Sequence, residues 1–375
     1  MRNSAIMSRS AKRLTACGAA LVLLAGLAWW MAHVPAVQDA LLRRMVERTL
    51  GATRNDLLAD NALRVVLCGT GNPLPDPNRA DACTAVLAGG NMYLVDAGPG
   101  SWKNLALWHL PAPKLAAVML THYHSDHIGD LGDINMQTWA QGRANPLRVF
   151  GPPGVEQVVG GFAQAYALDR DYRVAHHGAA LMPPANWTME PHVVKIDAEP
   201  GAAPCAGGSA TVLEENGLKV TAFTVNHAPV VPAYGYRFDY KGRSVVISGD
   251  TTKCANLVAQ ARGADVLIHE AQSATMVKLI EDAASRRGNA RVAKIMSDIL
   301  RYHTTPEDAA AEANQAGVRL LVLSHIGPPT PNAFVRMSFM RGVGAVRPRG
   351  VVLGYDGMLL TLPAGSDTID ISSVN

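Results

Sequence analysis

The chain has 375 residues, of which 48% are hydrophobic and 17% are charged, with 34 Gly and 23 Pro. This globular composition excludes collagen, a coiled coil and a mainly disordered chain. The formal charge is only +3, and no long basic run forms a stripe that could follow a phosphate backbone. The charge therefore argues against nucleic acid as a partner.

The first 36 residues differ from the rest of the chain. Basic residues, including Arg9, Lys12 and Arg13, precede an uncharged apolar stretch at 14–34, which is long enough to cross a bilayer as one helix. Trp29 and Trp30 would lie at its far interface. Residues 1–36 are therefore predicted to be a signal or transmembrane anchor that contacts the membrane.

The basic cluster before this stretch predicts an exported chain, because positive charges stay on the cytoplasmic side. The domain that follows would then be membrane-anchored outside the cytoplasm, or periplasmic or secreted if the leader is cleaved. Residues 37–62 have the spacing of an amphipathic connecting helix. Residues 63–375 are predicted to form one domain, with an irregular insertion at about 151–220.

Within this domain, short strands rich in branched side chains alternate with helices. The clearest helix begins after Thr305, an N-cap followed by Pro306, and ends at Gly317. The pattern predicts an α/β fold with two mixed sheets and helices on their outer faces.

Four potential metal ligands crowd into the segment LTHYHSDHIG, where a predicted strand ends. They are His122, His124, Asp126 and His127. Burying three imidazoles and a carboxylate together costs free energy unless their lone pairs coordinate a metal or interact with a charged partner. The cluster can serve two ions, and nitrogen and oxygen ligands favour zinc, with manganese or iron as alternatives.

Three further candidate ligands each end an apolar run. His227 ends TAFTVNH, Asp250 ends SVVISGD and His325 ends LLVLSH. Functional side chains commonly lie where the strands of a rigid sheet give way to loops. We therefore expect these three residues to complete the metal site.

The full set resembles the metallo-β-lactamase superfamily, whose pattern is His-x-His-x-Asp-His followed by isolated His, Asp and His. The resemblance covers roughly residues 63–360 and implies a four-layer αββα sandwich with two zinc ions in the cleft between the sheets. By motif position, one zinc would be held by His122, His124 and His227, the other by Asp126, His127 and His325, with Asp250 as the bridge. Asp96 in LVDAGPG would support the metal loop without binding metal.

Two other segments, containing Glu270 in HEA and His303 in HTT, are similar to the paired motifs of the ribonuclease Z group. There the two residues work near the leaving group, and a His beside a carboxylate is a suitable proton donor. Ribonuclease Z inserts a tRNA-gripping arm between the third ligand and the bridging Asp. Only 22 residues separate His227 from Asp250, so the arm has no room.

Segments such as CGTGNPLPDPNRADACTAVLAGG are more similar to the arylsulfatase branch of the superfamily. The predicted function is therefore a dinuclear-zinc hydrolase of small-molecule sulfate (or phosphate) esters, aryl sulfates first, acting through a hydroxide that bridges the metals. Asp126, Glu270 and His303 are the predicted catalytic residues. The alternative is a ribonuclease Z-like phosphodiesterase or nuclease.

The chain has five Cys, too few for a disulfide scaffold. Cys68 and Cys83 lie at neighbouring strand ends, where an exported chain could form a disulfide, and Cys205 with Cys254 is a second possible pair. The spacing does not decide the pairing.

Overall fold

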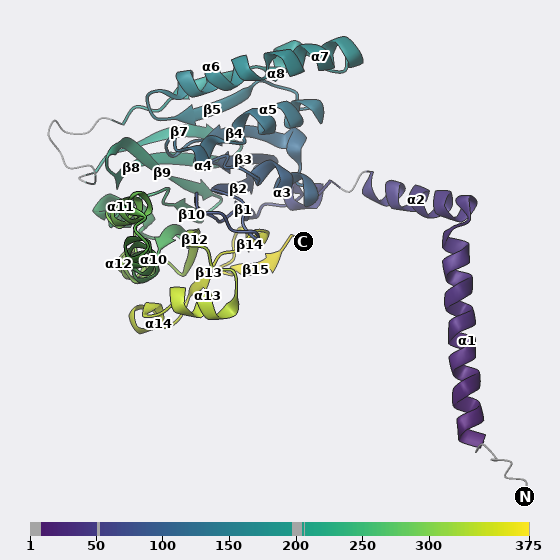
Figure 1. Cartoon of the computed structure of the whole chain (residues 1–375). Coiled ribbons are helices and arrows are strands. Elements are labelled where there is room, and N and C mark those ends of the chain that lie inside the picture. The colour runs from purple at the N-terminus through teal and green to yellow at the C-terminus, as the bar shows by residue number, and fades with distance from the viewer. Residues whose placement is uncertain (1–8, 51–52, 197–204, 206, 375) are drawn as a thin grey trace, which may run out of the picture. The chain divides into compact units, whose positions relative to one another are not determined.

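The computed structural model describes residues 9–50, 53–196, 205 and 207–374. It has two compact units, Met1–Thr53 and Arg54–Asn375, drawn in Figure 1. Residues 1–8 of the predicted leader, 51–52 of the predicted connecting helix, and 197–204 and 206 of the predicted insertion lie outside the described residues.

The first unit contains two helices, α1 (Arg9–Ala32) and α2 (Pro35–Thr49). Among the described helices, none alone is both long and apolar enough to cross a membrane, and only α1 from Ala16 together with α2 meets that criterion, as a pair bent by 77°. The straight part, Ala16–Ala32, is about 25 Å long at 1.5 Å per residue. A hydrocarbon core is about 30 Å thick.

The predicted N-terminal membrane helix is therefore not supported. The prediction treated 14–34 as one straight span, but α1 ends at Ala32 and a new helix begins at Pro35. The predicted contact with a membrane, and the predicted location of the domain outside the cytoplasm, depended on that single straight span, and this basis for them was wrong.

The second unit is built on two mixed sheets. The eight-stranded sheet has the order β15-β14-β1-β2-β3-β4-β5-β6. Its strands are β1 (Leu63–Gly69), β2 (Cys83–Ala88), β3 (Asn91–Val95), β4 (Leu115–Met119), β5 (Leu147–Gly151), β6 (Met189–Val193), β14 (Met358–Leu362) and β15 (Asp370–Ser373). Strands β3 to β6 are parallel, and the remaining pairs are antiparallel.

The seven-stranded sheet has the order β13-β12-β11-β10-β9-β8-β7. Its strands are β7 (Ser209–Glu215), β8 (Leu218–His227), β9 (Val230–Tyr240), β10 (Arg243–Ile247), β11 (Val266–Gln272), β12 (Leu320–Gly327) and β13 (Val351–Leu353). Strands β10 to β13 are parallel, so β10, β11 and β12 end at one edge.

The main core lies between the sheets. Because successive strand residues point to opposite faces, Val65 and Leu67 of β1 pack with Tyr236 and Ile268 of the other sheet, whereas Val66 belongs to the outer cluster. Each such buried side chain stabilises the fold by roughly 1.5–3 kcal/mol.

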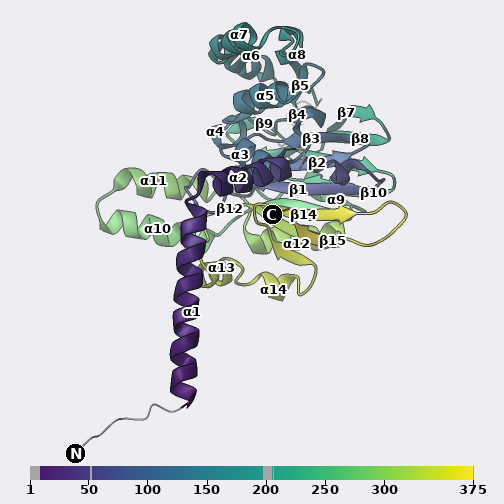
Figure 2. The same cartoon turned by 90° about the vertical axis from the view of Figure 1, so that its right-hand side faces the viewer.

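Helices cover both outer faces, which gives four layers (Figures 1 and 2). Leu105, Leu131 and Val155 pack α3 (Ser101–Leu107), α5 (Leu131–Ala140) and α6 (Val155–Ala165) on the eight-stranded sheet. Helices α9 (Ala255–Ala261), α12 (Pro306–Ala316) and α13 (Ala333–Phe339) cover the other sheet. The remaining helices are α4 (Ser125–Ile128), α7 (Ala167–His177), α8 (Pro184–Trp187), α10 (Ala274–Arg286), α11 (Ala290–Ile299), α14 (Val343–Val346), and the 3-10 helices η1 (Asn55–Leu58) and η2 (Ala112–Lys114).

Helix α12 confirms the predicted capping. The Thr305 hydroxyl accepts a hydrogen bond from the Asp308 backbone N–H at 3.1 Å, and Gly317 ends the helix at φ +70°, a conformation that favours glycine. The segment 151–220 is more regular than predicted, because it supplies the edge strands β6 and β7, one to each sheet.

Two disulfides are present in the described residues. Cys68–Cys83 joins β1 to β2, and Cys205–Cys254 joins the segment before β7 to the start of α9. Cys17 is a free, exposed cysteine.

Candidate metal centre

The seven candidate ligands meet at the edge of the sandwich where β4, β8, β10 and β12 end. His122 and His124 follow β4, and Asp126 and His127 lie on the short helix α4. His227 is the last residue of β8, Asp250 follows β10, and His325 lies near the end of β12. Loops that leave the carboxyl ends of strands form binding sites in many α/β proteins.

His122, His124 and His227 form the first cluster. His122 Nε2 is 2.9 Å from His124 Nδ1, and His227 Nε2 is 3.5 Å from the same Nδ1. Asp250 Oδ2 lies 4.0 Å from His122 Nε2 and 3.8 Å from His227 Nε2. These four residues could hold one metal ion.

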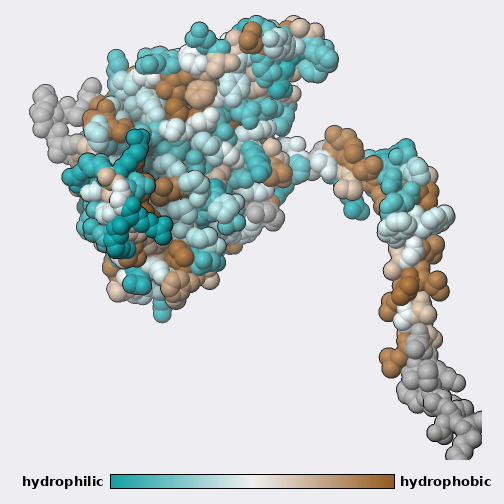
Figure 3. Space-filling view, viewed as in Figure 1, coloured by the Kyte–Doolittle hydropathy of each residue, from teal (hydrophilic) through white to brown (hydrophobic). Residues whose placement is uncertain are grey.

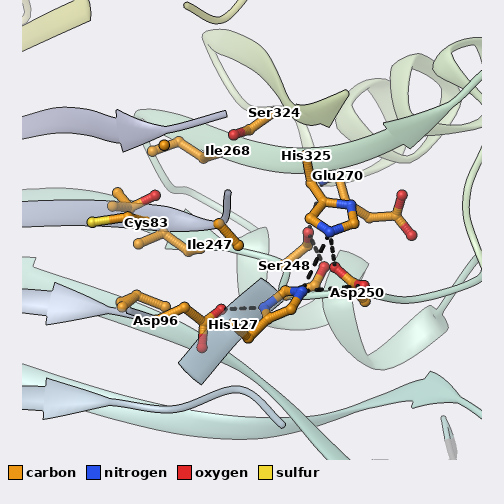
Figure 4. A pocket seen from close by; sticks show the side chains of 15 residues that line it. Cys83, Asp96, His127, Ile247, Ser248, Asp250, Ile268, Glu270, Ser324 and His325 are labelled. Carbon is orange, nitrogen blue, oxygen red and sulfur yellow. Dashed lines mark hydrogen bonds and ion pairs between the residues drawn. The ribbon is translucent and has the colours of Figure 1, made fainter. Parts of the chain in front are cut away.

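Asp126, His127 and His325 form the second cluster. His325 Nε2 is 3.1 Å from Asp126 Oδ2 and 3.3 Å from His127 Nε2. His127 Nε2 is also 3.4 Å from Asp126 Oδ2 and 3.4 Å from Asp250 Oδ2. Asp250 thus touches both clusters, as Figure 4 shows for the second.

The distances between ligand atoms in the second cluster fit a cation with tetrahedral coordination. Zinc binds His nitrogen and carboxylate oxygen at about 2.0–2.1 Å, which corresponds to about 3.3–3.4 Å between neighbouring ligand atoms. The distances above lie close to this value. Asp250 Oδ1 is also buried without a hydrogen-bond partner, and a buried carboxylate oxygen in this state calls for a cation.

The ring nitrogens are oriented for metal binding. His127 Nδ1 is 2.8 Å from Asp96 Oδ2, and His227 Nδ1 is 2.9 Å from the Tyr302 carbonyl oxygen. Both partners only accept hydrogen bonds, so each Nδ1 donates its proton and each Nε2 keeps its lone pair for the site. Figure 4 shows His127 between Asp96 on one side and Asp250 with His325 on the other.

Burial and charge shape the protonation of the two clusters differently. Burial lowers the pKa of His122 well below its usual value and also lowers the pKa of His124 and His227, which favours neutral, ligating rings. Burial alone would also lower the pKa of His325, but the charge of Asp250 and a hydrogen bond with Asp126 raise it to about 9. The carboxylates around the second cluster therefore favour a positive charge there, and a divalent ion would supply it.

The backbone is constrained where the ligands are presented. Asp96 and His325 have φ values of 62° and 49°, a left-handed conformation that residues other than glycine adopt rarely. Gly249 precedes Asp250 at φ +60°, and a Cβ there would lie 2.5 Å from the Tyr234 carbonyl oxygen. Only glycine allows this close approach.

Glu270 and His303 form a pair beside Asp250. His303 Nδ1 is 2.9 Å from Glu270 Oε1 and 4.0 Å from Asp250 Oδ2. Burial lowers the pKa of His303, but the charge of Glu270 and their hydrogen bond outweigh it and raise this pKa above its usual value. His303 can also be grouped with Asp250 and His325 as a possible metal site.

Several contributors were not predicted. The Thr121 hydroxyl binds the Asp96 carboxylate at 2.9 Å, and the backbone N–H groups of Thr251 and Thr304 donate to Glu270 Oε1 at 3.1 and 3.2 Å. The two N–H groups belong to the backbone, which is the same for almost every residue type, so the sequence does not reveal their role. His269, the neighbour of Glu270, points to the opposite face of β11 and pairs with Glu312 at 3.3 Å.

A cavity of about 300 Å³ opens over both clusters. His124, Asp126, Asp250, His303 and His325 lie in its floor and wall, and Leu74, Ile295, Met296 and Ile299 add apolar surface. A smaller cavity of about 40 Å³ lies between the sheets, against His127 and Asp250. The larger cavity can admit a substrate to the candidate metal centre.

Replacing Asp96 with alanine should weaken metal binding by roughly 10- to 100-fold, the usual effect of losing a group that orients a His ligand. The change leaves the buried His127 Nδ1–H without its acceptor. Zinc affinity measured by competition with a chelator checks this. Asp60→Ala, which removes an acid paired with Arg64, is the control, and equal affinities in the two variants would contradict the role given to Asp96.

The four-layer sandwich and its His/Asp cluster define a metal-binding α/β protein of the metallo-β-lactamase fold. The chain belongs to the family described as "Beta-lactamase superfamily domain", which matches residues 91–326 and so includes all seven candidate ligands. The superfamily prediction is confirmed.

Curated relatives and solved structures agree with this assignment. Ribonuclease Z of Mycolicibacterium paratuberculosis is 37% identical over 269 residues, which cover 71% of this chain and 86% of the relative. Ribonuclease Z of Mycobacterium bovis is 38% identical over 269 residues, which again cover 71% of this chain and 86% of the relative. The short form of human tRNase Z has a TM-score of 0.54 at 22% identity and covers 80% of this chain and 99% of that chain.

The metallo-β-lactamase fold protein YhfI of Bacillus subtilis also has a TM-score of 0.54, at 19% identity, with the same coverage.

The relatives correct one prediction. Nucleic acid was expected not to be a partner, but the curated relatives are ribonucleases by name. They also support the ribonuclease Z-like alternative better than the sulfate ester hydrolase.

Proposed function

We propose that this protein is a dinuclear-zinc phosphodiesterase that cleaves RNA. The observation that carries the proposal is the Glu270–His303 pair, 2.9 Å apart, in which His303 lines the cavity over the metal clusters. An aryl sulfate releases a phenolate, whose conjugate acid has a pKa near 10, and this group leaves with little help. An RNA phosphodiester releases a ribose alkoxide, which needs a proton donor.

His122, His124 and His227 would hold one zinc, Asp126, His127 and His325 the other, and Asp250 would contact both. Ligands that are all nitrogen and oxygen favour zinc, and manganese would fit as well. When bound, the two ions would supply an activated water and neutralise charge on the phosphate oxygens.

The chain's own residues would do the remaining work. Asp126 would help to orient the attacking water from the floor of the cavity. His303 would give a proton to the leaving oxygen, and Glu270 would stabilise the imidazolium form of that ring. The backbone N–H groups of Thr251 and Thr304 hold the Glu270 carboxylate in place.

The test is to offer the zinc-loaded full chain a precursor tRNA with a 3′ extension, bis(p-nitrophenyl) phosphate and p-nitrophenyl sulfate. We expect the two phosphodiesters to be cleaved, with little or no turnover of the sulfate. Faster turnover of the sulfate than of either phosphodiester would contradict the proposal.

A further inference from the structure

A helical hairpin links the two halves of the Glu270–His303 pair. Helices α10 and α11 lie between β11, which carries Glu270, and the loop that carries His303, and they project side by side from the sandwich in Figure 2. The base of the hairpin is fixed, because Gln272 Nε2 donates to the Ile299 carbonyl oxygen at 2.8 Å. The hairpin is thus continuous with the candidate active site.

The base of α11 forms a wall of the substrate cavity. Ile295, Met296 and Ile299 line it together with Tyr302 and His303. The Tyr302 carbonyl oxygen also accepts from His227 Nδ1. A polymeric substrate with its reacting group in the cavity would therefore lie next to α11.

The far end of the hairpin is a cationic tip, residues 286–294, with the sequence RRGNARVAK and no acidic residue. Arg286, Arg287 and Arg291 are exposed, and none has a carboxylate partner among the described residues. Lys294, by contrast, pairs with Asp298 at 2.5 Å. Figure 3 shows strongly hydrophilic atoms gathered over this part of the molecule.

We propose that the cationic tip binds the phosphate backbone of the RNA whose cleavage site lies in the cavity. This inference rests on the proposed function. Arginine binds phosphate oxygens with paired hydrogen bonds, and such contacts position a nucleic acid without reading its sequence. Arg291 lies eight residues from Ile299, roughly 12 Å along the helix, so the tip contacts nucleotides beyond the one in the cavity.

The charge distribution favours RNA as the occupant. The whole chain has a net charge of only +3, so non-specific attraction of a polyanion is weak. The three guanidinium groups at the end of the hairpin, which have no carboxylate partner among the described residues, supply a local attraction. RNA also reaches both the tip and the cavity as one continuous strand. The tip thus takes up the gripping task for which 228–249 has no room.

The test compares two variants of the full zinc-loaded chain. One is Arg286→Gln/Arg287→Gln/Arg291→Gln. The matched control is Lys103→Gln/Lys219→Gln/Arg262→Gln, which removes the same charge from exposed residues on other elements. Binding of a fluorescein-labelled precursor tRNA is followed by anisotropy at several salt concentrations, and hydrolysis of bis(p-nitrophenyl) phosphate is measured alongside.

We expect the tip variant to bind RNA roughly tenfold more weakly at low salt and to lower the slope of log K against log salt by about 2, for three lost contacts with single-stranded RNA. Hydrolysis of the small diester should stay unchanged, and so should RNA binding by the control. Equal RNA affinities and slopes for the tip variant and the wild type would overturn the inference, as would an equal loss in the control. A tip variant that loses binding to anionic vesicles but not to RNA would also overturn it.

The two proposals fail differently. If wild-type protein does not hydrolyse the small diester, the proposed function has failed. If it hydrolyses the diester and the tip variant binds RNA normally, only the role of the tip has failed.

Discussion

Replacing Asp250 with alanine should reduce hydrolysis of every phosphodiester by roughly 10³-fold or more, the scale of losing a group that organises charge at a reaction centre. Asp250 lies within 4.0 Å of ring nitrogens in both clusters, so its removal disturbs both candidate metal positions at once. Zinc content per chain, measured after dialysis against a chelator, should fall together with activity.

The control for this variant is Asp239→Ala. Asp239 lies on β9 of the same sheet, pairs with Arg237 at 2.9 Å and lines neither cavity. It should keep its zinc and its activity. A folded Asp250→Ala protein with full zinc content and wild-type turnover would contradict the assignment of Asp250 as a shared ligand.

The strands that sequence analysis identified are those with buried, branched side chains. β10 and β11, for example, are buried along their whole length and read as apolar runs. The strands that were missed are β6, β7, β14 and β15. Three of them, β6, β7 and β15, are sheet edges with exposed positions, and their polar residues resemble loops, whereas β14 is buried inside its sheet. Edge strands form because a neighbouring strand offers hydrogen bonds, and the sequence does not show that neighbour.

The candidate ligands were predictable because their residue types are costly to bury and because they follow apolar strands. The structure brings all seven together. The Tyr302 carbonyl, which orients His227, and the Thr251 and Thr304 N–H groups, which hold Glu270, were less visible because they belong to the backbone. Their contribution depends on how the chain folds and not on which side chain it carries.

Two predictions were wrong because they used the overall hydrophobicity of a segment or the total charge of the chain instead of local structure. The apolar run at 14–34 was treated as one helix, although α1 ends at Ala32. The net charge of +3 hid the cationic tip, whose positive charge is balanced by acids elsewhere. A nucleic-acid surface depends on where unpaired charges lie, and a total does not show this.

Replacing His303 with alanine should slow cleavage of RNA by roughly 10²-fold or more, the usual contribution of a positioned general acid, while bis(p-nitrophenyl) phosphate should lose less than about tenfold. The reason is the leaving group. A ribose alkoxide depends on the proton that His303 supplies, whereas a nitrophenolate leaves readily without it. Turnover of the two substrates by the same zinc-loaded preparation checks the prediction.

Glu270→Gln should show the same substrate dependence with a smaller loss, because the amide can still accept from His303 Nδ1 but cannot stabilise the charged ring. His176→Ala, an exposed change on α7, is the control and should leave both rates unchanged. Equal losses on both substrates would exclude a leaving-group role for His303. A loss of bound zinc in His303→Ala would instead make His303 a metal ligand, in keeping with its distance of 4.0 Å from Asp250 Oδ2.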